Sequence, residues 1–242
     1  MREGAPRGLT WPRLVTASAA VVLLVVLGLA AWWVASSERR VTSYSVRGTL
    51  SAIDLDLGNA DAEIVGGREA PVVDVRRTDA FAFHRPAAAE RRVSDGTLRL
   101  RSRCPRTVLG SCSASYRLTV PNNVPVTVRT ASGDVSLEAF RGSAQIETGT
   151  GDVSATAYCG FVLRARAEDG DVAASASCAP NRLELRSRTG DVRAVVPPGR
   201  YRIDADTDSG RRRIDGLTMA EDAPFQILAL SDAGNVLLEA GP

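Results

Sequence analysis

Apolar and polar side chains alternate with a period of two through much of the chain after residue 45. In the first half the pattern marks short runs, such as Ile53, Leu55 and Leu57 separated by aspartates. The Asp95-Gly96 pair is typical of a tight turn between two antiparallel strands. No amphipathic helical stretch longer than about ten residues interrupts this half. Residues 45–123 are therefore predicted to form an irregular β-rich half.

From residue 124 onward the chain repeats a short motif. Four copies of a Gly-Asp motif lie 18, 19 and 20 residues apart: Ser132-Gly133-Asp134-Val135, Thr150-Gly151-Asp152-Val153, Asp169-Gly170-Asp171-Val172 and Thr189-Gly190-Asp191-Val192. Apolar residues occupy the first, third and fifth positions after each of these aspartates. A fifth, degraded copy begins near Asp208-Ser209-Gly210, and residues 232–236 are expected to close the array.

The period within each repeat indicates two short strands on either side of a turn. Stacking such units about 4.8 Å apart makes a parallel β-solenoid. We therefore predict an all-β fold that ends in a solenoid over residues 124–240, with rungs of 18–20 residues. Regularly spaced short strands also fit a β-sandwich, which remains the alternative.

The cysteines provide a test of the predicted register. Cys159 and Cys178 each lie seven residues after a repeat aspartate, so stacking puts one above the other, about 5 Å apart and within disulfide range. Cys104 and Cys112 are eight residues apart and would close the remaining loop. Four cysteines allow three pairings, of which we expect Cys104–Cys112 with Cys159–Cys178.

An uncharged run of 22 residues, 14–35, precedes the β-rich region. A helix of that length spans roughly 33 Å, enough for a hydrocarbon core of about 30 Å. We expect residues 1–13 to be a short cytoplasmic tail, 14–35 a single transmembrane anchor in the cytoplasmic membrane, and 36–44 a linker. The rest would be extracytoplasmic, where cysteines are oxidised. The alternative is a cleaved signal peptide, whose apolar region is usually shorter, about 7–15 residues.

Composition narrows the classes of function. The formal net charge is +2, so there is no bulk electrostatic argument for nucleic acid as a partner. The chain has a single histidine, His84, which removes most histidine-based catalysis and most histidine-ligated metal sites, and it has no Gly-x-Ser-x-Gly motif. We therefore expect no enzyme and no cofactor.

The repeat aspartates are the first candidate for chemistry, because stacking should align Asp134, Asp152, Asp171 and Asp191 in one row. Calcium-binding β-rolls hold Ca²⁺ with oxygen ligands from successive turns, but their glycine-rich nonapeptide signature is absent here. The favoured interpretation is that each Gly-Asp pair makes a tight turn, with a Ca²⁺ site as the weaker alternative. Stacked like charges repel, so a neutralising arginine or cation is expected nearby.

A second candidate is the basic run Arg211–Arg213, which interrupts the fifth repeat. Such a run can bind an anionic polymer or lipid headgroups, although three basic residues at a turn are usually only solvated.

The repeats, the Leu-Asp-Leu-Gly-Asn-Ala-Asp segment at 55–61 and the predicted anchor together resemble the bacterial putative-adhesin domain family of unknown function, over about residues 45–240. The resemblance implies an envelope β-solenoid and supplies no catalytic residues. It favours an extracytoplasmic, non-enzymatic binding module for a cell-envelope polymer or a surface or membrane protein. The alternative is an accessory domain that senses envelope stress through a membrane partner.

Overall fold

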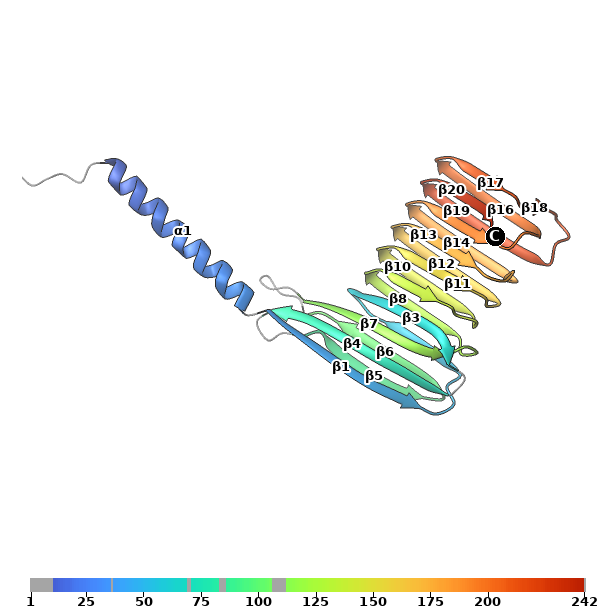
Figure 1. Ribbon diagram of the computed structural model, residues 1–242, viewed down its shortest axis with the longest axis horizontal. Coiled ribbons are helices and arrows are strands. Elements are labelled where there is room, and N and C mark those ends of the chain that lie inside the picture. Colours follow the sequence, from blue (N-terminus) through green and yellow to red (C-terminus); the bar gives the residue numbers. More distant parts are fainter. Residues whose placement is uncertain (1–10, 36, 69–70, 83–85, 106–111, 242) are drawn as a thin grey trace, which may run out of the picture.

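The computed structural model describes residues 11–35, 37–68, 71–82, 86–105 and 112–241. The α-helix α1 (Trp11–Ala35) projects from a region that holds all the described strands (Figure 1). Taken over these described ranges, the structure has no helix that is both long enough and apolar enough to cross a membrane. His84 and residues 1–10 lie outside the described residues.

The described strands form two sheets of ten strands each, which we call sheet A and sheet B. In spatial order, sheet A contains β1 (Ser37–Arg47), β4 (Val72–Ala82), β7 (Cys112–Pro121), β3 (Ala60–Arg68), β9 (Val135–Glu138), β11 (Val153–Tyr158), β13 (Val172–Ala176), β15 (Val192–Val196), β20 (Val236–Ala240) and β17 (Arg212–Asp215). Sheet B contains β18 (Thr218–Met219), β16 (Arg200–Ser209), β19 (Phe225–Ala233), β14 (Arg182–Thr189), β12 (Val162–Asp169), β10 (Ala144–Thr150), β8 (Val126–Ser132), β2 (Ala52–Asp56), β6 (Thr97–Arg103) and β5 (Ala88–Ser94).

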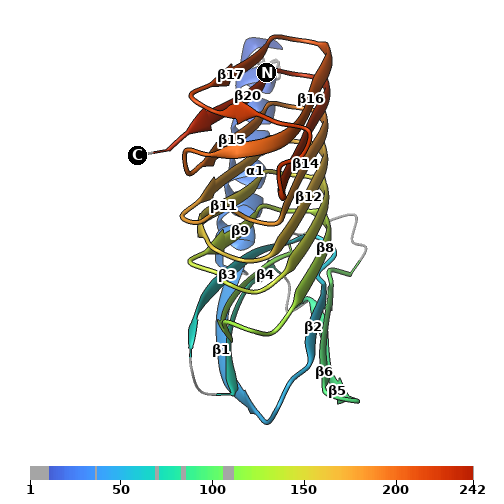
Figure 2. The same ribbon diagram turned by 90° about the vertical axis from the view of Figure 1, so that its right-hand side faces the viewer.

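The two sheets face each other and are joined rung by rung (Figures 1 and 2). Each repeat supplies one strand to sheet B, turns at its Gly-Asp pair, and supplies the next strand to sheet A. Equivalent residues pair in parallel register, so that Ile146 lies beside Val128 on one side and Ala165 on the other. The fold is therefore a parallel β-solenoid rather than a sandwich of antiparallel strands.

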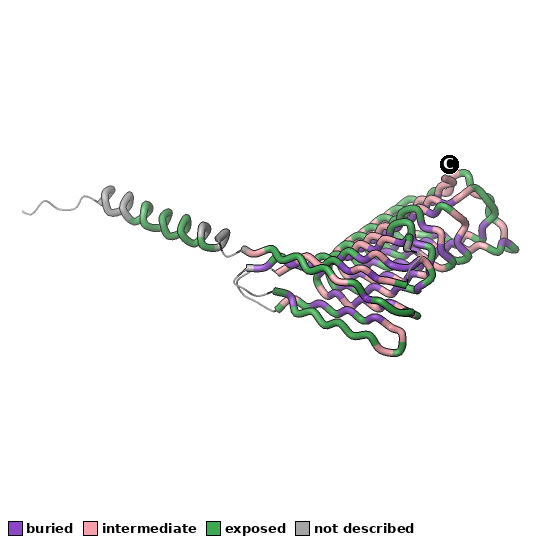
Figure 3. The backbone as a smooth tube through the Cα atoms, turned by 60° about the horizontal axis from the view of Figure 1, so that its bottom comes forward, coloured by how far each residue is buried: buried purple, intermediate pink, exposed green. Residues whose placement is uncertain are grey.

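The core lies between the sheets and is built from the inward residues of each strand. Buried and exposed positions alternate along the strands, as Figure 3 shows. The fifth position after the repeat aspartate is buried in the later rungs, at Ala176 and Val196, but not in the first two. There Ala139 and Ala157 adopt positive φ angles of 49° and 52° and turn outward.

The outward turn brings the next side chain into the core in each of those two rungs. Phe140 and Tyr158, six residues after the aspartate, are completely buried, and the Tyr158 hydroxyl donates to the Gly142 carbonyl at 2.9 Å. A large aromatic ring thus fills the interior where the repeat pattern predicted a small alanine.

The solenoid is longer than the sequence predicted, and its rungs do not follow chain order at either end. At the N-terminal end, the rung β2–β3 lies between the rungs β6–β7 and β8–β9, so residues of the predicted irregular half continue the stack. At the other end, β19–β20 lies between β14–β15 and β16–β17. Residues 232–236 therefore do not close the array; the degraded fifth copy does.

Three antiparallel strands extend the N-terminal end of the sheets. β5 pairs with β6 through the predicted Asp95-Gly96 turn, and β4 pairs with β7. β1 pairs with β4 from residue 37 onward, which corrects the prediction that 36–44 is a linker. The polar composition of this segment is explained by its place at the open edge of sheet A, where most of its side chains are exposed.

Polar contacts occupy the interior at this end, where the apolar core stops. Arg77 pairs with Asp79 at 2.6 Å and donates to the Ala87 carbonyl at 2.6 Å, and Asp79 is only 3% exposed. The Arg91 guanidinium lies over the Tyr44 ring, 4.7 Å from its centroid, and joins β5 to β1 across the gap between the sheets. The contacts of Arg77 and Asp79 satisfy buried charges that would otherwise be costly.

Both disulfides join the pairs that the sequence analysis favoured. Cys104–Cys112 connects the end of β6 to the start of β7, with Cα atoms 5.8 Å apart. Cys159–Cys178 joins the turns of two adjacent rungs, with Cα atoms 5.0 Å apart.

Candidate functional site: a polar trough on sheet A

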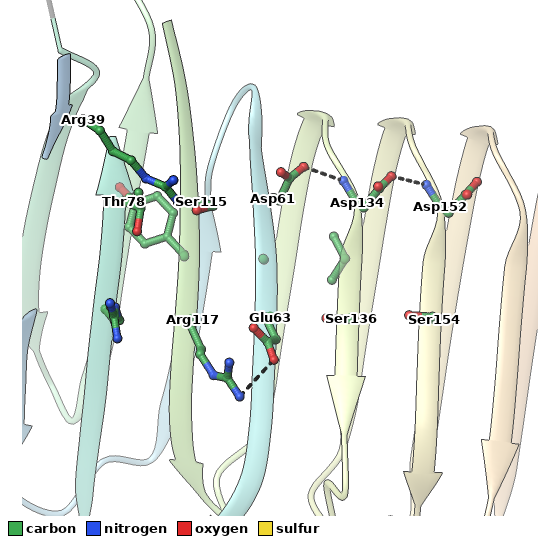
Figure 4. Close-up of a pocket in the computed structure, with 14 residues that line it drawn as sticks. Arg39, Asp61, Glu63, Thr78, Ser115, Arg117, Asp134, Ser136, Asp152 and Ser154 are labelled. Atoms are coloured by element: carbon green, nitrogen blue, oxygen red, sulfur yellow. Dashed lines mark hydrogen bonds and ion pairs between the residues drawn. The ribbon is translucent and has the colours of Figure 1, made fainter. Parts of the chain in front are cut away.

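One corner of the solenoid carries a continuous row of side-chain-to-backbone hydrogen bonds, which we call the Asp ladder. In each step, a side-chain Oδ1 accepts the backbone N–H of the equivalent residue in the next rung. The donor and acceptor residues are, in order, Asp134 and Asp61 (3.0 Å), Asp152 and Asp134 (2.9 Å), Asp171 and Asp152 (2.8 Å), Asp191 and Asp171 (2.7 Å), and Asn235 and Asp191 (2.7 Å). Figure 4 shows the first two of these bonds.

The structure places the four predicted aspartates in one row and adds Asp61 before them and Asn235 after them. The Asp61 position was present in the motif at 55–61, but its distance in the chain from Asp134 hid the contact.

Within the described ranges, no group of three or more histidine, cysteine or acidic side chains is placed to hold a metal ion. Nor does an ion pair between described residues join an arginine to any of the four predicted aspartates. Backbone N–H groups, rather than arginines, are the partners of the carboxylates.

A second row of hydrogen bonds runs inside the same corner. Hydroxyl groups four residues before the ladder position donate to glycine carbonyls of the neighbouring rung. The donor and acceptor residues are Thr130 and Gly58 (2.7 Å), Thr148 and Gly133 (3.2 Å), Ser187 and Gly170 (2.7 Å), Thr207 and Gly234 (2.7 Å), and Ser231 and Gly190 (2.8 Å). The recurrence of Ser or Thr at this position is a signal that could have revealed the row from the sequence, although Ala167 interrupts it.

Next to the Asp ladder, the outer face of sheet A has a floor of small side chains. Ser136, Ser154 and Ala173 lie side by side on β9, β11 and β13. Arg193 continues the same row on β15. We call the surface formed by this floor and the Asp ladder the polar trough.

The trough deepens into a hollow at each end. The first hollow, of about 550 Å³, is lined by Arg39, Asp61, Glu63, Arg76, Thr78, Ser115, Arg117, Asp134, Ser136, Asp152 and Ser154 among others (Figure 4). The second, of about 540 Å³, is lined by Asp171, Ala173, Asp191, Arg193, Arg211, Arg213, Asn235 and Leu237 among others. The lining of the first hollow ends on β11 and that of the second begins at the adjacent strand β13, and the floor row runs across both strands.

Charge is segregated within the first hollow. Its three arginines come from β1, β4 and β7, and its acidic residues come from β3 and from the turns that lead into β9 and β11. The ion pair between Arg117 and Glu63, at 3.2 Å, marks the boundary. The trough therefore offers an arginine-rich end and a carboxylate-lined edge to anything that lies along it.

The three arginines of the basic run at 211–213 contact different partners. Arg211 donates its backbone N–H to Asn235 Oδ1 at 3.1 Å, and so ends the Asp ladder. Arg212 donates to the Ala205 carbonyl at 3.0 Å, and Arg213 pairs with Asp215 at 2.5 Å. The run is thus not a single basic patch, although Arg211 and Arg213 both line the second hollow.

This architecture defines a class of protein: a two-sheet parallel β-solenoid with a regular polar outer face. Residues 111–224 match the Toastrack DUF4097 family, so this part of the solenoid is similar to a Toastrack domain. The match begins at β7 and ends before β19, and the solenoid continues beyond it on both sides.

Two solved structures are similar to this chain. A putative cell adhesion protein from Clostridium sporogenes ATCC 15579 is 11% identical, with a TM-score of 0.53, and the match covers 84% of this chain and 100% of that one. A putative adhesin from Bacteroides fragilis NCTC 9343 is 12% identical, with a TM-score of 0.47 and coverage of 84% and 97%. At such identities the first likeness shows the fold alone. No curated protein matches the chain.

Proposed function

We propose that the protein is a membrane-anchored, extracytoplasmic and non-enzymatic binding module whose polar trough holds an extended partner in the cell envelope. The observation that carries this proposal is the continuity of the trough across the rungs, with small side chains on its floor. Small side chains let a partner chain approach the sheet closely, and no large residue of the floor row interrupts it between Ser136 and Ala173.

The repeat makes the trough suited to a partner that is itself repetitive. Strands lie about 4.8 Å apart, so a chain that lies across them meets equivalent groups at each step. At Asp134 and Asp152, one carboxylate oxygen is engaged by the backbone of the next rung, and the other is available to accept hydrogen bonds from hydroxyl groups. A cell-envelope polymer with many hydroxyl groups has this character. The description of the Clostridium structure as that of a putative cell adhesion protein agrees with such a role.

The location is inferred from two features. The sequence carries an uncharged run of 22 residues at 14–35, the length expected of an anchor, and β1 follows it from Ser37. The two disulfides are typical of an oxidising compartment outside the cytoplasm. The short interval between α1 and β1 also favours the second candidate, an envelope-stress sensor, because a load on sheet A would reach the helix directly.

The test compares retention of envelope fractions by the full chain in neutral-detergent micelles. Ser154→Trp places a large ring on the trough floor, and Thr127→Trp places the same ring on the outer face of sheet B at a comparably half-buried position. We expect wall polymer to be retained by the unchanged protein and by Thr127→Trp, and to be lost by Ser154→Trp. Equal retention by both variants, or none by the unchanged protein, would contradict the proposal. Retention of a membrane protein instead of wall polymer would favour the sensor.

A further inference from the structure

Two arginines face each other across neighbouring strands at the N-terminal end of the trough. Arg76 on β4 and Arg117 on β7 are direct partners in the antiparallel register, and both are exposed. Like charges placed directly opposite in a sheet destabilise it. Glu63 lies 3.2 Å from Arg117 and relieves part of this repulsion. Among the described residues, neither Arg76 nor Arg39 has an acid within ion-pair distance, so positive charge here is left without a partner.

Elsewhere on the molecule, the positive charge of several arginines is neutralised by ion pairs with acidic side chains. On sheet B, Glu184 accepts contacts from three arginines, at 3.4, 3.4 and 2.9 Å. At the far end of the trough, Arg193 pairs with Glu239 at 2.7 Å and Arg213 pairs with Asp215. The arginine end on β1, β4 and β7 differs, because among the described residues only Arg117, one of the three arginines that line the same hollow, has an ion pair with an acid.

Hydroxyl groups surround the arginines on both sides. Thr78 and Ser115 line the first hollow with them (Figure 4). A further hollow of about 430 Å³ on the other side contains Ser43 and Thr119 and shares Arg76 and Arg117. Guanidinium N–H groups and hydroxyls are the donors that bind carboxylate and phosphate oxygens, and arginine often does so through two parallel bonds.

From this arrangement we propose that Arg39, Arg76 and Arg117 bind oxyanion groups, phosphodiester or carboxylate, carried by an extended polyol chain. The inference rests on the proposed function, since it names the chemistry of the partner at one end of the same trough. Glu63 holds Arg117 in position, and Arg76 and Arg39 are the groups that the anion neutralises. The Asp ladder repels anions, so the ligand's charged groups lie over β4 and β7 and its hydroxyl groups lie along the aspartates.

The experiment measures binding of three polymers to the full chain in neutral-detergent micelles: poly(glycerol phosphate), polygalacturonate and uncharged dextran. The variants are Arg76→Gln and Arg117→Gln. Arg166→Gln is the matched control, since Arg166 is exposed on sheet B and has no ion pair among the described residues. We expect each trough variant to bind the polyanions about tenfold more weakly, the loss of one charge-assisted hydrogen bond. The control should bind as the unchanged protein does, and added salt should weaken binding.

Folding is checked by the melting temperature. Arg76→Gln removes a like-charge contact, so its Tm should equal or exceed that of the unchanged protein. A preference for one polyanion identifies the phosphodiester or the carboxylate as the source of the oxyanion, and both results support the inference. Binding of neither polyanion, equal binding of dextran, or equal weakening in Arg166→Gln overturns it. If wall polymer is still retained by Arg76→Gln but not by Ser154→Trp, the proposed function stands and this inference alone fails.

Discussion

The backbone N–H of Asp171 donates to Oδ1 of Asp152, one rung away, at 2.8 Å. The bond ties together two turns that are 19 residues apart in the chain, and equivalent bonds repeat along the whole corner. The Asp ladder thus has a structural role that is independent of any ligand, and its side chains border the trough with their geometry already set.

Replacement of Asp152 separates hydrogen bonding from charge. Asp152→Ala removes the acceptor and should lower the free energy of unfolding by about 1 kcal/mol. Asp152→Asn keeps an Oδ1 acceptor and removes one charge between Asp134 and Asp171, so we expect little loss. Asn235 already has this chemistry at a ladder position, because its Oδ1 accepts the backbone N–H of Arg211. Urea unfolding measures both variants, and an asparagine variant as unstable as the alanine variant would contradict the acceptor role.

Close packing of turns should make the repeat glycines intolerant of a side chain. Gly170 has a φ of 152°, and a Cβ there would collide with the Gly151 carbonyl. We expect Gly170→Ala to cost more than about 2 kcal/mol in thermal or urea unfolding. Gly67 is the control, because its φ of 126° is similarly unfavourable for alanine but the space around it is open. Equal losses in the two variants would show that backbone conformation alone, and not the contact between rungs, is responsible.

The Cys159–Cys178 bond should stabilise the stack by restricting the unfolded chain. It closes a loop of 19 residues, for which removal typically costs about 3 kcal/mol. We expect the double variant Cys159→Ser with Cys178→Ser to unfold at lower urea concentration. Peptide mapping without reduction checks the pairing itself, and a Cys104–Cys159 link would contradict the register.

Alkaline titration should reveal the burial of the tyrosines. Burial raises the pKa of all four, Tyr44, Tyr116, Tyr158 and Tyr201, above the ordinary value of about 10. The folded state therefore favours the protonated phenols. This stabilisation is fully present below about pH 10 and is lost as the pH rises toward the folded-state pKa values. Phenolate absorbance should appear together with unfolding rather than before it, and a simple titration near pH 10 in the folded protein would contradict this.

Truncation after Asp222 tests the unusual order of the last rungs. β19–β20 separates β16–β17 from the rest of the stack, so its removal should also release residues 200–215. We expect hydrogen exchange in 200–215 to lose its protection while β10–β13 keep theirs. Continued protection of 200–215 would mean that this rung packs against β14–β15 directly.

The periodicity of the chain by itself determined the repeating part of the fold. Alternation with a period of two, combined with regularly spaced Gly-Asp turns, led to two strands per rung, parallel register, the aspartate row and the Cys159–Cys178 pair, which left Cys104 and Cys112 to pair with each other. These features are predictable because equivalent residues of identical units stack on one another, so the spacing in sequence becomes position in space. The hydroxyl row could have been predicted in the same way.

Only the tertiary structure decided what lies outside that repetition. Parallel rungs present similar edges, so the place of β2–β3 and β19–β20 in the stack depends on which edge packs best and not on chain order. Phe140 and Tyr158 replace the expected alanines because a residue with positive φ shifts the register of side chains by one. The arginine end of the trough brings together Arg39, Arg76 and Arg117, which are far apart in the sequence and meet only because β1, β4 and β7 are adjacent in sheet A.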